Sequence, residues 1–200
     1  MQASWRHDGD KLTWIICTPL QNSSSTSPSP SDSKRTQVDA QTDDQPANMV
    51  GDVNLFIAED DSFDPDDSDS DHVVPLVGEL EIMIARKAFQ RQGIARSALL
   101  TFMYYVLQNL AVIADEYSSS QGGAKTARRA MRLECFRVRI GSGNAGSIAL
   151  FEGLGFRRVT ERANYFGELE LRRVIGHGLV EEIGRDGMFE MPRVLEYVSP

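Results

Sequence analysis

Short apolar runs of strand length dominate the first half of the chain. Three of them, Leu12–Cys17, Val50–Ile57 and Leu76–Ala85, are rich in aliphatic residues and are bounded by polar or turn-forming residues. Runs of this length and composition are typical of strands that are buried on at least one face. We therefore predict three strands, joined by polar connections, before the first long helix.

The second half of the chain alternates between helical and extended patterns. Ser97–Ala114 repeats apolar residues at helical spacing, and so does the stretch from Asn144 to Gly155, where a glycine can take the left-handed conformation that ends a helix. The extended patterns are Leu133–Ile140, Arg157–Val159 and Tyr165–Val174, of which the last two suggest a closing antiparallel pair. A mainly antiparallel start followed by mixed elements predicts an α+β fold.

Composition indicates one folded domain with polar insertions. Apolar residues make up 41% of the 200 residues, which is enough for a single core. Three stretches, 21–48, 58–72 and 117–130, hold too few apolar residues to offset the entropy of ordering them, so we expect loops there. We predict one domain over residues 1–174 and treat 175–200 as a C-terminal tail.

The formal net charge of −8 comes from one stretch. Eight of the 29 acidic residues lie between Glu59 and Asp71, where there is no Lys or Arg, and the rest of the chain holds 21 acids against 21 bases. This neutral remainder argues against nucleic-acid binding by a basic surface. The acidic stretch lacks the central Gly and the final Glu of a calcium loop, so we predict no metal site.

The remaining composition is typical of a protein from a reducing compartment. Cys17 and Cys135 fall in strand patterns, where a small buried thiol is the default interpretation. The first ten residues lack the apolar segment of a signal peptide, and polar residues interrupt the apolar run Ala98–Ala114. We expect a cytoplasmic or nuclear protein that does not enter a membrane.

The strand-to-helix turn Gln90–Ala95 has the features of an anion-binding loop. Gly93 and Ala95 carry little or no side chain, so backbone N–H groups can approach a bound group, and the next helix points its positive end at the same place. Such a loop favours a pyrophosphate. The chain has neither the Gly-Lys-Ser/Thr of a P-loop nor a complete G-x-G-x-x-G. The alternative is a glycine-containing turn that binds no ligand.

Two motifs together resemble the GCN5-related N-acetyltransferases. Gln90–Ala95 reads Q-R-Q-G-I-A and is similar to the family's Q/R-x-x-G-x-G/A loop, which holds the pyrophosphate of acetyl-coenzyme A (acetyl-CoA). Asn144–Phe156 resembles the downstream element N-x-x-[SA]-x-x-x-[YF]-x-x-x-G-F. The resemblance implies a mixed, mainly antiparallel central sheet flanked by helices.

Flanking segments resemble one branch of that family, the N-acetyltransferase 9-like proteins. They are Met1–Trp5, Met49–Phe56 and Gly78–Ala85. The resemblance does not cover the family's N-terminal strand and two helices, because only eleven residues precede Leu12. We therefore expect a truncated version of the domain that lacks one wall of the family's acceptor site.

The resemblance also implies which residues bind the coenzyme. The backbone of Met83, Ile84 and Ala85 should pair with the pantetheine arm, and an N–H there should polarise the thioester oxygen. The other expected contacts are Gln90, Arg91, Gln92, Gly93, Ile94, Ala95, Arg96, Asn144, Ser147 and Phe151. Many relatives have, in place of Phe151, a tyrosine that protonates the departing thiolate, so this proton donor is missing here.

Two carboxylates are candidates for the general base. Strand alternation puts Glu79 and Glu81 on one face of Leu76–Ala85, and Leu80 and Ile82 on the other. Family members that use a carboxylate base carry it on this strand, so either residue is expected to take the proton of the acceptor amine. The alternative is that both are exposed charged residues without a catalytic role.

These observations predict an acetyl-CoA-dependent N-acetyltransferase that acts by direct transfer. The acceptor is an amine of a protein N-terminus, a lysine or a small molecule. The alternative is a catalytically weak or inactive scaffold that uses the acidic and Ser/Thr-rich insertions to bind proteins. Phe151 and the truncation favour the scaffold, whereas the Gln90–Ala95 loop and Asn144 favour the enzyme. Only the enzyme requires a coenzyme site.

Overall fold

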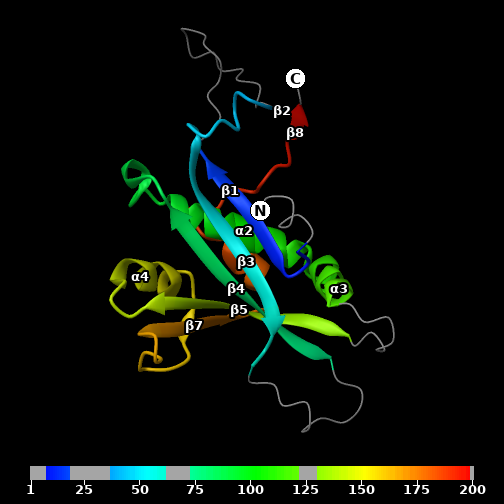
Figure 1. The fold of residues 1–200 in the computed structure, drawn as a ribbon, viewed down its shortest axis with the longest axis vertical. Coiled ribbons are helices and arrows are strands. Elements are labelled where there is room, and N and C mark those ends of the chain that lie inside the picture. The colour runs from blue at the N-terminus through cyan, green and yellow to red at the C-terminus, as the bar shows by residue number, and fades with distance from the viewer. Residues whose placement is uncertain (1–7, 19–36, 62–72, 122–129, 199–200) are drawn as a thin grey trace.

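One six-stranded sheet forms the centre of the molecule (Figure 1). The computed structural model describes residues 8–18, 37–61, 73–121 and 130–198. The strand order is β1-β3-β4-β5-β7-β6, and neighbours are antiparallel except for β4 and β5, which are parallel. The strands are β1 Lys11–Cys17, β3 Met49–Glu59, β4 Val74–Ile84, β5 Met131–Gly141, β6 Arg157–Arg158 and β7 Glu168–Val174. This mixed, mainly antiparallel sheet with flanking helices confirms the predicted α+β fold.

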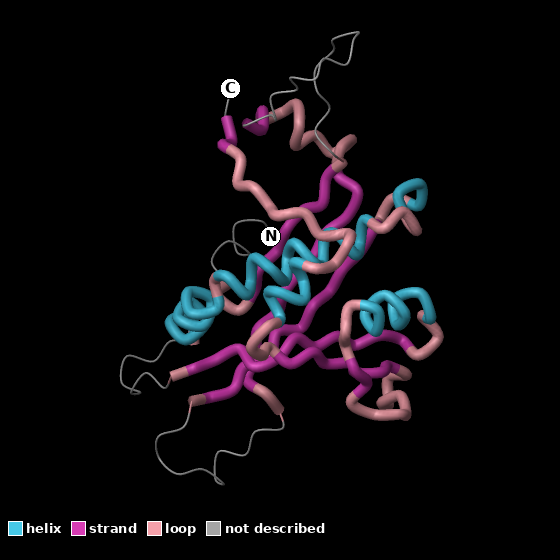
Figure 2. Tube along the Cα trace, turned by 180° about the vertical axis from the view of Figure 1, so that it is seen from behind, coloured by secondary structure: helices cyan, strands magenta, loops and turns pink. Residues whose placement is uncertain are grey.

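The two faces of the sheet differ because side chains alternate along each strand. On β3, Val53, Leu55 and Ile57 are buried, whereas the intervening Asn54 and Phe56 are only partly buried. Helices α2 (Ile94–Gln108) and α3 (Leu110–Ser120) cross the sheet on one side, as the view from behind shows (Figure 2). The opposite face of β1, β3 and β4 carries polar side chains together with the exposed Ile15 and Met83.

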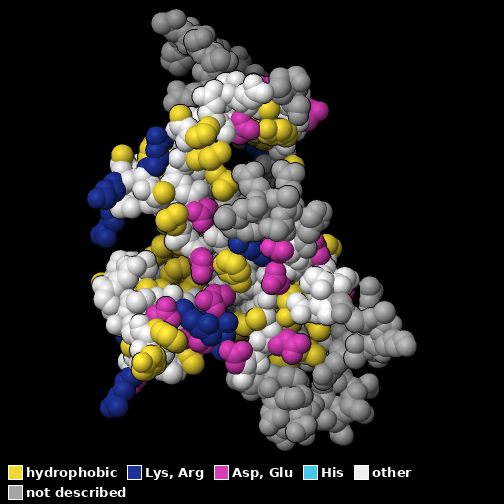
Figure 3. Space-filling view, in the orientation of Figure 1, with side chains coloured by type: hydrophobic (Ala, Val, Ile, Leu, Met, Phe, Trp, Pro, Cys, Tyr) yellow, Lys and Arg dark blue, Asp and Glu magenta, His cyan; other side chains and the backbone are white. Residues whose placement is uncertain are grey.

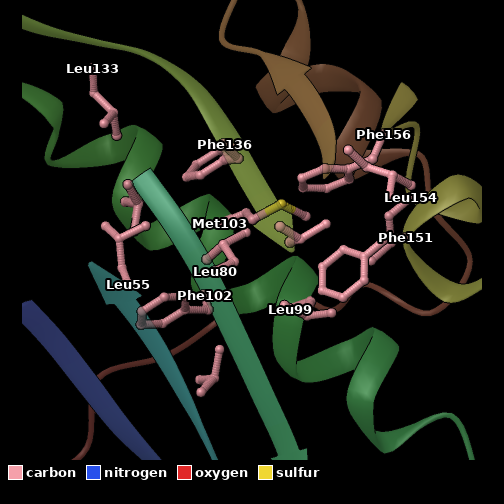
Figure 4. Packing of buried hydrophobic residues seen from close by; sticks show 14 of the residues in the cluster. Leu55, Leu80, Leu99, Phe102, Met103, Leu133, Phe136, Phe151, Leu154 and Phe156 are labelled. Atoms are coloured by element: carbon pink, nitrogen blue, oxygen red, sulfur yellow. The ribbon is translucent and has the colours of Figure 1, made fainter. Parts of the chain in front are cut away.

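The main core lies between the sheet and α2 (Figure 4). Phe102 and Met103 of α2 are fully buried and belong to the same cluster as Leu55 and Leu80 of the sheet. Burial of each such side chain stabilises the fold by roughly 1.5–3 kcal/mol. At the sheet edge, the Trp14 ring packs edge-on against Phe102 with ring centroids 5.1 Å apart, and this contact holds β1 onto the helix.

The single helix predicted over Ser97–Ala114 is instead two helices. The two helices meet at Asn109 with a bend of 76°. Neither of them, nor any other single helix among the described residues, is long and apolar enough to cross a membrane. The Asn109 amide donates to the Val106 carbonyl, and its side-chain Nδ2 donates to the Tyr105 carbonyl at 2.8 Å. Asn109 therefore satisfies the last carbonyls of α2 and ends that helix.

Parts of the predicted insertions are ordered. Residues 37–48 contain strand β2 (Gln37–Asp39) and a series of turns, and residues 117–120 belong to α3. Asp60, at the start of the acidic stretch, forms an ion pair with Arg172 of β7 at 2.8 Å. Expectations for 19–36, 62–72 and 122–129 lie outside the described residues. Of the two cysteines, Cys135 is buried as predicted, but Cys17, at the end of an edge strand, is exposed.

The C-terminal residues are part of the domain rather than a separate tail. Helix α5 (Leu179–Gly184) places Leu179 and Ile183 in the same buried cluster as the residues of α2. The chain then continues to strand β8 (Glu196–Val198), which pairs in parallel with β2. Residue 174 is therefore not a structural boundary.

An ion pair fixes the segment after α5 to the first turn of α2. Asp186 Oδ2 lies 2.5 Å from Arg96 Nη2, and the Met188 amide donates to Asp186 Oδ1 at 2.9 Å. The Ser97 hydroxyl donates to the Met188 carbonyl at 3.1 Å. The hydrogen bond from Arg96, and then that from the Met188 amide, lower the pKa of Asp186.

Truncation of the buried α5 side chain tests whether the C-terminal segment folds with the domain. Ile183→Ala should lower the free energy of unfolding by about 2–5 kcal/mol, because Ile183 is only 1% exposed and a cavity would remain. Urea unfolding should show one cooperative transition. Val174→Ala, at a position that is 72% exposed, is the control and should change stability little. An Ile183→Ala variant with the free energy of unfolding of the wild type would contradict this packing.

The Asp186 ion pair should make stability depend on pH in the acidic range. The folded state lowers the pKa of Asp186, so its contribution is complete above the unfolded pKa and is lost as pH falls through the folded value. Asp186→Asn should therefore lower Tm at pH ~7, and the difference from the wild type should shrink below pH ~4. Thermal unfolding followed across this pH range measures it. A difference in Tm that grows as the pH falls would refute the stabilising role of the ionised Asp186.

Candidate active site

The parallel strands β4 and β5 separate halfway along the sheet. They pair only from Val74–Met131 to Glu79–Arg137, and beyond that point Leu80–Ile84 pairs with β3 alone. Figure 1 shows β5 turning away with β7 while β4 continues beside β3. The backbone groups on this side of Leu80–Ile84 have no strand partner among the described residues. A gap of this kind accepts an extended chain through main-chain hydrogen bonds.

A cavity of about 650 Å³ lies at the open end of this gap. Its volume is in the range usual for ligand sites. It brings together the end of β4, the turn after it, the start of α2 and the first turns of α4 (Ala145–Gly153). The residues that line it are Ile82, Ile84, Phe89, Gln90, Arg91, Gly93, Ile94, Ala95, Arg96, Asn144, Gly146, Ser147, Ala149 and Leu150. Two motifs that are far apart in the sequence thus face one cavity.

The turn before α2 is held open by its own side chains. A short 3-10 helix, η2 (Lys87–Phe89), precedes it, and the Gln90 side chain donates to the Ile84 carbonyl at 2.8 Å. Arg91 and Gly93 have positive φ angles of 62° and 82°. Among the described residues, no side chain caps the N-terminus of α2. Its first N–H groups and the positive end of the helix therefore remain available for an anion.

The N-terminus of α4 forms the other wall of the cavity. Asn144 is its N-cap, and its side-chain oxygen accepts from the Ser147 amide at 3.1 Å. Asn144 thus has a structural role that the motif alone did not reveal. Arg91 Nη1 lies 3.5 Å from the position that a Cβ on Gly146 would occupy. A guanidinium therefore stands at the point where two helix N-termini converge, a combination that favours a pyrophosphate.

Several of the expected coenzyme contacts lie elsewhere. Phe151 is 3% exposed and packs edge-on against Phe156 in the core, with ring centroids 5.1 Å apart, so it does not line the cavity. Ser147 lines the cavity, whereas Phe151, one turn later on nearly the same face of α4, is buried against Phe156. Met83, Ala85 and Gln92 are also not among the lining residues. The contact expected of Met83 and Ala85 is through the backbone, so their prediction stands as before. Five lining residues were not predicted from the sequence, although strand alternation and helical spacing indicate the faces of all but Phe89: Ile82, Phe89, Gly146, Ala149 and Leu150.

The two carboxylates of β4 have different surroundings. Glu79 Oε2 accepts from Arg137 Nε at 2.9 Å and lies 3.4 Å from Arg139 Nη1. Glu81 is exposed and makes no hydrogen bond or ion pair with any described residue. Its neighbour across the sheet is Asn54 of β3. Only Glu81 is therefore free to accept a proton without first breaking an ion pair.

Arginines and acids form a network over β5 and β7, where Figure 3 shows Lys or Arg side chains ringed by Asp and Glu. Arg137 is 5% exposed, and its Nη1 lies 3.6 Å from Asp61 without forming a hydrogen bond. Arg139 joins Glu79 to Glu170, with Nε 3.6 Å from the Glu170 carboxylate. The network fixes the point at which β4 and β5 separate.

Other candidate groups lie away from the cavity. Arg132 pairs with Glu134 at 2.5 Å near the start of β5, at the opposite end of the sheet from Gly93. Three further basic residues close to it in the sequence lie outside the described residues: Lys125, Arg128 and Arg129. No group of His, Cys, Asp and Glu in the described part of the chain is arranged to hold a metal ion.

Comparisons with known structures and family models give limited information. No protein-family model matches the chain. NAA60 of Arabidopsis thaliana with a bisubstrate analogue is 14% identical and has a TM-score of 0.48, with 84% of this chain and 77% of that one covered. A spermidine N-acetyltransferase chimera from Vibrio cholerae and hSSAT has a TM-score of 0.48 at 14% identity, with 92% and 78% covered.

Curated sequences are more similar. The N-acetyltransferase 9-like protein of Schizosaccharomyces pombe is 35% identical over 183 residues, which cover 86% of this chain and 73% of that protein. The alpha/beta-tubulin-N-acetyltransferase 9 of Drosophila melanogaster is 32% identical, with 88% and 64% covered. The protein of that name from Mus musculus is 30% identical, and the chain spans 52% of its length. Because the first match extends over most of both chains, this chain belongs to the N-acetyltransferase 9-like family of acetyltransferases.

Proposed function

We propose that this chain binds acetyl-CoA across the divided sheet and transfers the acetyl group directly to a protein amine. The observation that carries the proposal is the position of the cavity. It opens on one side of Leu80–Ile84, and the unpaired carboxylate of Glu81 lies on the opposite face of the same strand segment. A thioester that enters the gap from the cavity can therefore meet an amine that arrives from the other face.

The residues of the cavity fit the diphosphate end of the coenzyme. The uncapped N–H groups of Ile94, Ala95 and Arg96 at the start of α2, together with the Arg91 guanidinium, supply donors for the pyrophosphate. The free edge of Leu80–Ile84 supplies main-chain partners for the pantetheine arm. Ile82 and Ile84 line the apolar part of the path.

Bound acetyl-CoA supplies an activated acyl group as a thioester. A backbone N–H on the free edge of β4 stabilises the negative charge that develops on the thioester oxygen. The amine nitrogen forms a bond to the carbonyl carbon, the carbon–sulfur bond breaks, and Glu81 accepts the amine proton directly or through water. Phe151 has no proton to give, so water protonates the departing thiolate.

The proposed acceptor is an amine of tubulin or of a similar protein. Three relatives, from Mus musculus, Drosophila melanogaster and Homo sapiens, are named alpha/beta-tubulin-N-acetyltransferase 9. The face that carries Glu81 supports a protein acceptor because it presents polar groups beside the exposed apolar side chains of Ile15 and Met83. There the Thr13 hydroxyl donates to Asn54 Oδ1, and Asn54 Nδ2 donates to Asp52, each at 2.7 Å. A peptide can use these groups for hydrogen bonds.

A noncatalytic scaffold is the second candidate, and the buried Phe151 is the observation that favours it. The scaffold needs no intact cavity and no unpaired Glu81. Coenzyme binding and acetyl transfer measured on the same protein distinguish the two candidates. Binding without transfer to any amine, including tubulin, would favour the scaffold.

Gly146→Glu should abolish most acetyl-CoA binding without unfolding the protein. A Cβ at Gly146 has room, because its nearest neighbours would be Arg91 Nη1 at 3.5 Å and Asn144 Oδ1 at 3.9 Å. The new carboxylate would repel the pyrophosphate and pair with Arg91. We expect at least a tenfold weaker Kd by calorimetry. Gly93→Glu should weaken binding too, but the φ of 82° at Gly93 adds backbone strain. Ala111→Glu adds the same charge on an exposed position of α3 and should bind as the wild type does. Equal affinity of Gly146→Glu and wild type would place the coenzyme elsewhere.

Glu81→Gln should lower kcat about 10²–10⁴-fold, because the amide cannot take the amine proton. The Kd for acetyl-CoA should stay within about twofold of wild type, since Glu81 does not line the cavity. Initial rates with tubulin as the acceptor, across a range of pH, measure this. Glu116→Gln, on exposed α3, is the matched control. Undiminished turnover by Glu81→Gln would remove Glu81 from the mechanism.

A further inference from the structure

Charged side chains border the gap between β4 and β5 on the face that carries Glu81. Glu79 and Arg137 are the last residues that pair across the two strands, and their side chains form an ion pair at 2.9 Å. Glu81 and Arg139 each lie two residues further along, on the same face as Glu79 and Arg137. Glu81 and Arg139 therefore stand on opposite sides of the gap where it begins. A peptide whose amine meets Glu81 lies close to Arg139.

Arg137 has a donor group without an acceptor. The residue is 5% exposed, and its Nε and Nη2 atoms each lie 2.9 Å from Glu79 Oε2. Its Nη1 atom is completely buried and forms no hydrogen bond with a described residue. Burial without an acceptor is unfavourable for any N–H group, and more so for a charged one. The Nη1 group therefore has unmet capacity for an acceptor oxygen.

Asp61 lies beside this nitrogen but does not bond to it. Its carboxylate is 3.6 Å from Arg137 Nη1 and 3.7 Å from Arg139 Nη2, and it makes no hydrogen bond with a described residue. The Asp61 side chain is 73% exposed. Glu79, by contrast, accepts a hydrogen bond from Arg137 and is 19% exposed. Asp61 is thus held by charge alone, and a competing carboxylate can displace it.

Arg139 has unused donors at the same place. Its Nη1 lies 3.4 Å from Glu79 Oε2 and its Nε lies 3.6 Å from Glu170 Oε2, but neither contact is a hydrogen bond. The side chain is 35% exposed. A guanidinium offers five N–H donors in one plane and can bind a carboxylate through two of them. Arg137 and Arg139 together therefore present free donors to one carboxylate position.

We propose that Arg137 Nη1 and Arg139 form a carboxylate subsite, which binds an acidic side chain of the acceptor protein in place of Asp61. This inference rests on the proposed function, because it takes the acceptor amine to lie at Glu81. An extended peptide advances about 3.3 Å per residue, so the acidic side chain belongs to one of the first few residues after the amine. Exchange of one carboxylate for another leaves the net charge of the network unchanged, and Arg137 gains its missing acceptor.

The test measures equilibrium binding of short peptides that have a free N-terminal amine and a fluorescent label at the C-terminus. One Glu occupies the second, third or fourth position, and each peptide has a Gln counterpart. At one of these positions the wild type should bind the Glu peptide about tenfold more tightly, the lower end for charge-assisted bonds because Arg139 is partly exposed. Fluorescence anisotropy gives both Kd values and needs no turnover.

Two variants separate a ligand subsite from a structural ion pair. Arg139→Gln should lose most of the preference for Glu. Asp61→Asn should increase the preference about threefold, because the competing exposed carboxylate is gone. The matched controls are Arg158→Gln, which removes an exposed ion pair with Glu152, and Asp115→Asn, on an exposed position of α3. Both controls should keep the wild-type ratio of the two Kd values, which is insensitive to a general loss of stability.

Different failures separate the two proposals. Equal or undetectable binding of the Glu and Gln peptides at all three positions, with acetyl-CoA binding and transfer intact, would overturn the subsite and leave the proposed function standing. A preference that falls in Asp61→Asn would also overturn the subsite, because Asp61 would then be a structural partner of Arg137. Folded wild type that binds no acetyl-CoA would overturn the proposed function, whereas a preference for Glu that Arg139→Gln abolishes would still support the carboxylate subsite.

Discussion

The separation of β4 from β5 beyond Glu79 is the feature on which the rest of this structure depends. Up to that point the two parallel strands share a hydrogen-bonded ladder, and after it each follows a different antiparallel partner, β3 or β7. The separation leaves one edge of Leu80–Ile84 without a strand partner and brings the turn before α2 close to the first turn of α4. A continuous sheet would hydrogen-bond this edge within itself and leave no place for an extended ligand.

The point of separation is stabilised by charge as well as by packing. Arg137 is almost completely buried there, and a buried guanidinium is tolerated only where partners offset the lost hydration. Glu79 supplies that partner on the neighbouring strand, and Asp61 lies near the remaining nitrogen. The carboxylate of Glu79 is therefore occupied by a structural ion pair. Glu81 lies two residues along the same face of β4, and its carboxylate has no such partner among the described residues.

The C-terminal segment connects the stability of the fold to the proposed coenzyme site. Helix α5 is anchored by two buried side chains, and the loop after it reaches the first turn of α2, where it binds Arg96 and Ser97. Met188 lies so close to Gly93 that a Cβ there would come within 2.6 Å of its methyl group. A structural change in this segment therefore reaches the Gln90–Ala95 turn through direct contacts.

The sequence by itself determined the elements and the local chemistry. Strand runs, the Gln90–Ala95 turn, the Asn144 helix and its end at Gly155 follow from residue type and period, because backbone preference and side-chain alternation are local properties. The tertiary structure decided which of these side chains form ion pairs or pack in the core and which remain available. Glu79 and Glu81 are alike in sequence and share one face, yet a residue 58 positions later on β5 pairs with one and leaves the other free. The burial of Phe151 and the contact of Asp186 with Arg96 were hidden for the same reason, because each depends on partners that folding brings together. The break at Asn109 is different, since its hydrogen bonds to Tyr105 and Val106 are local.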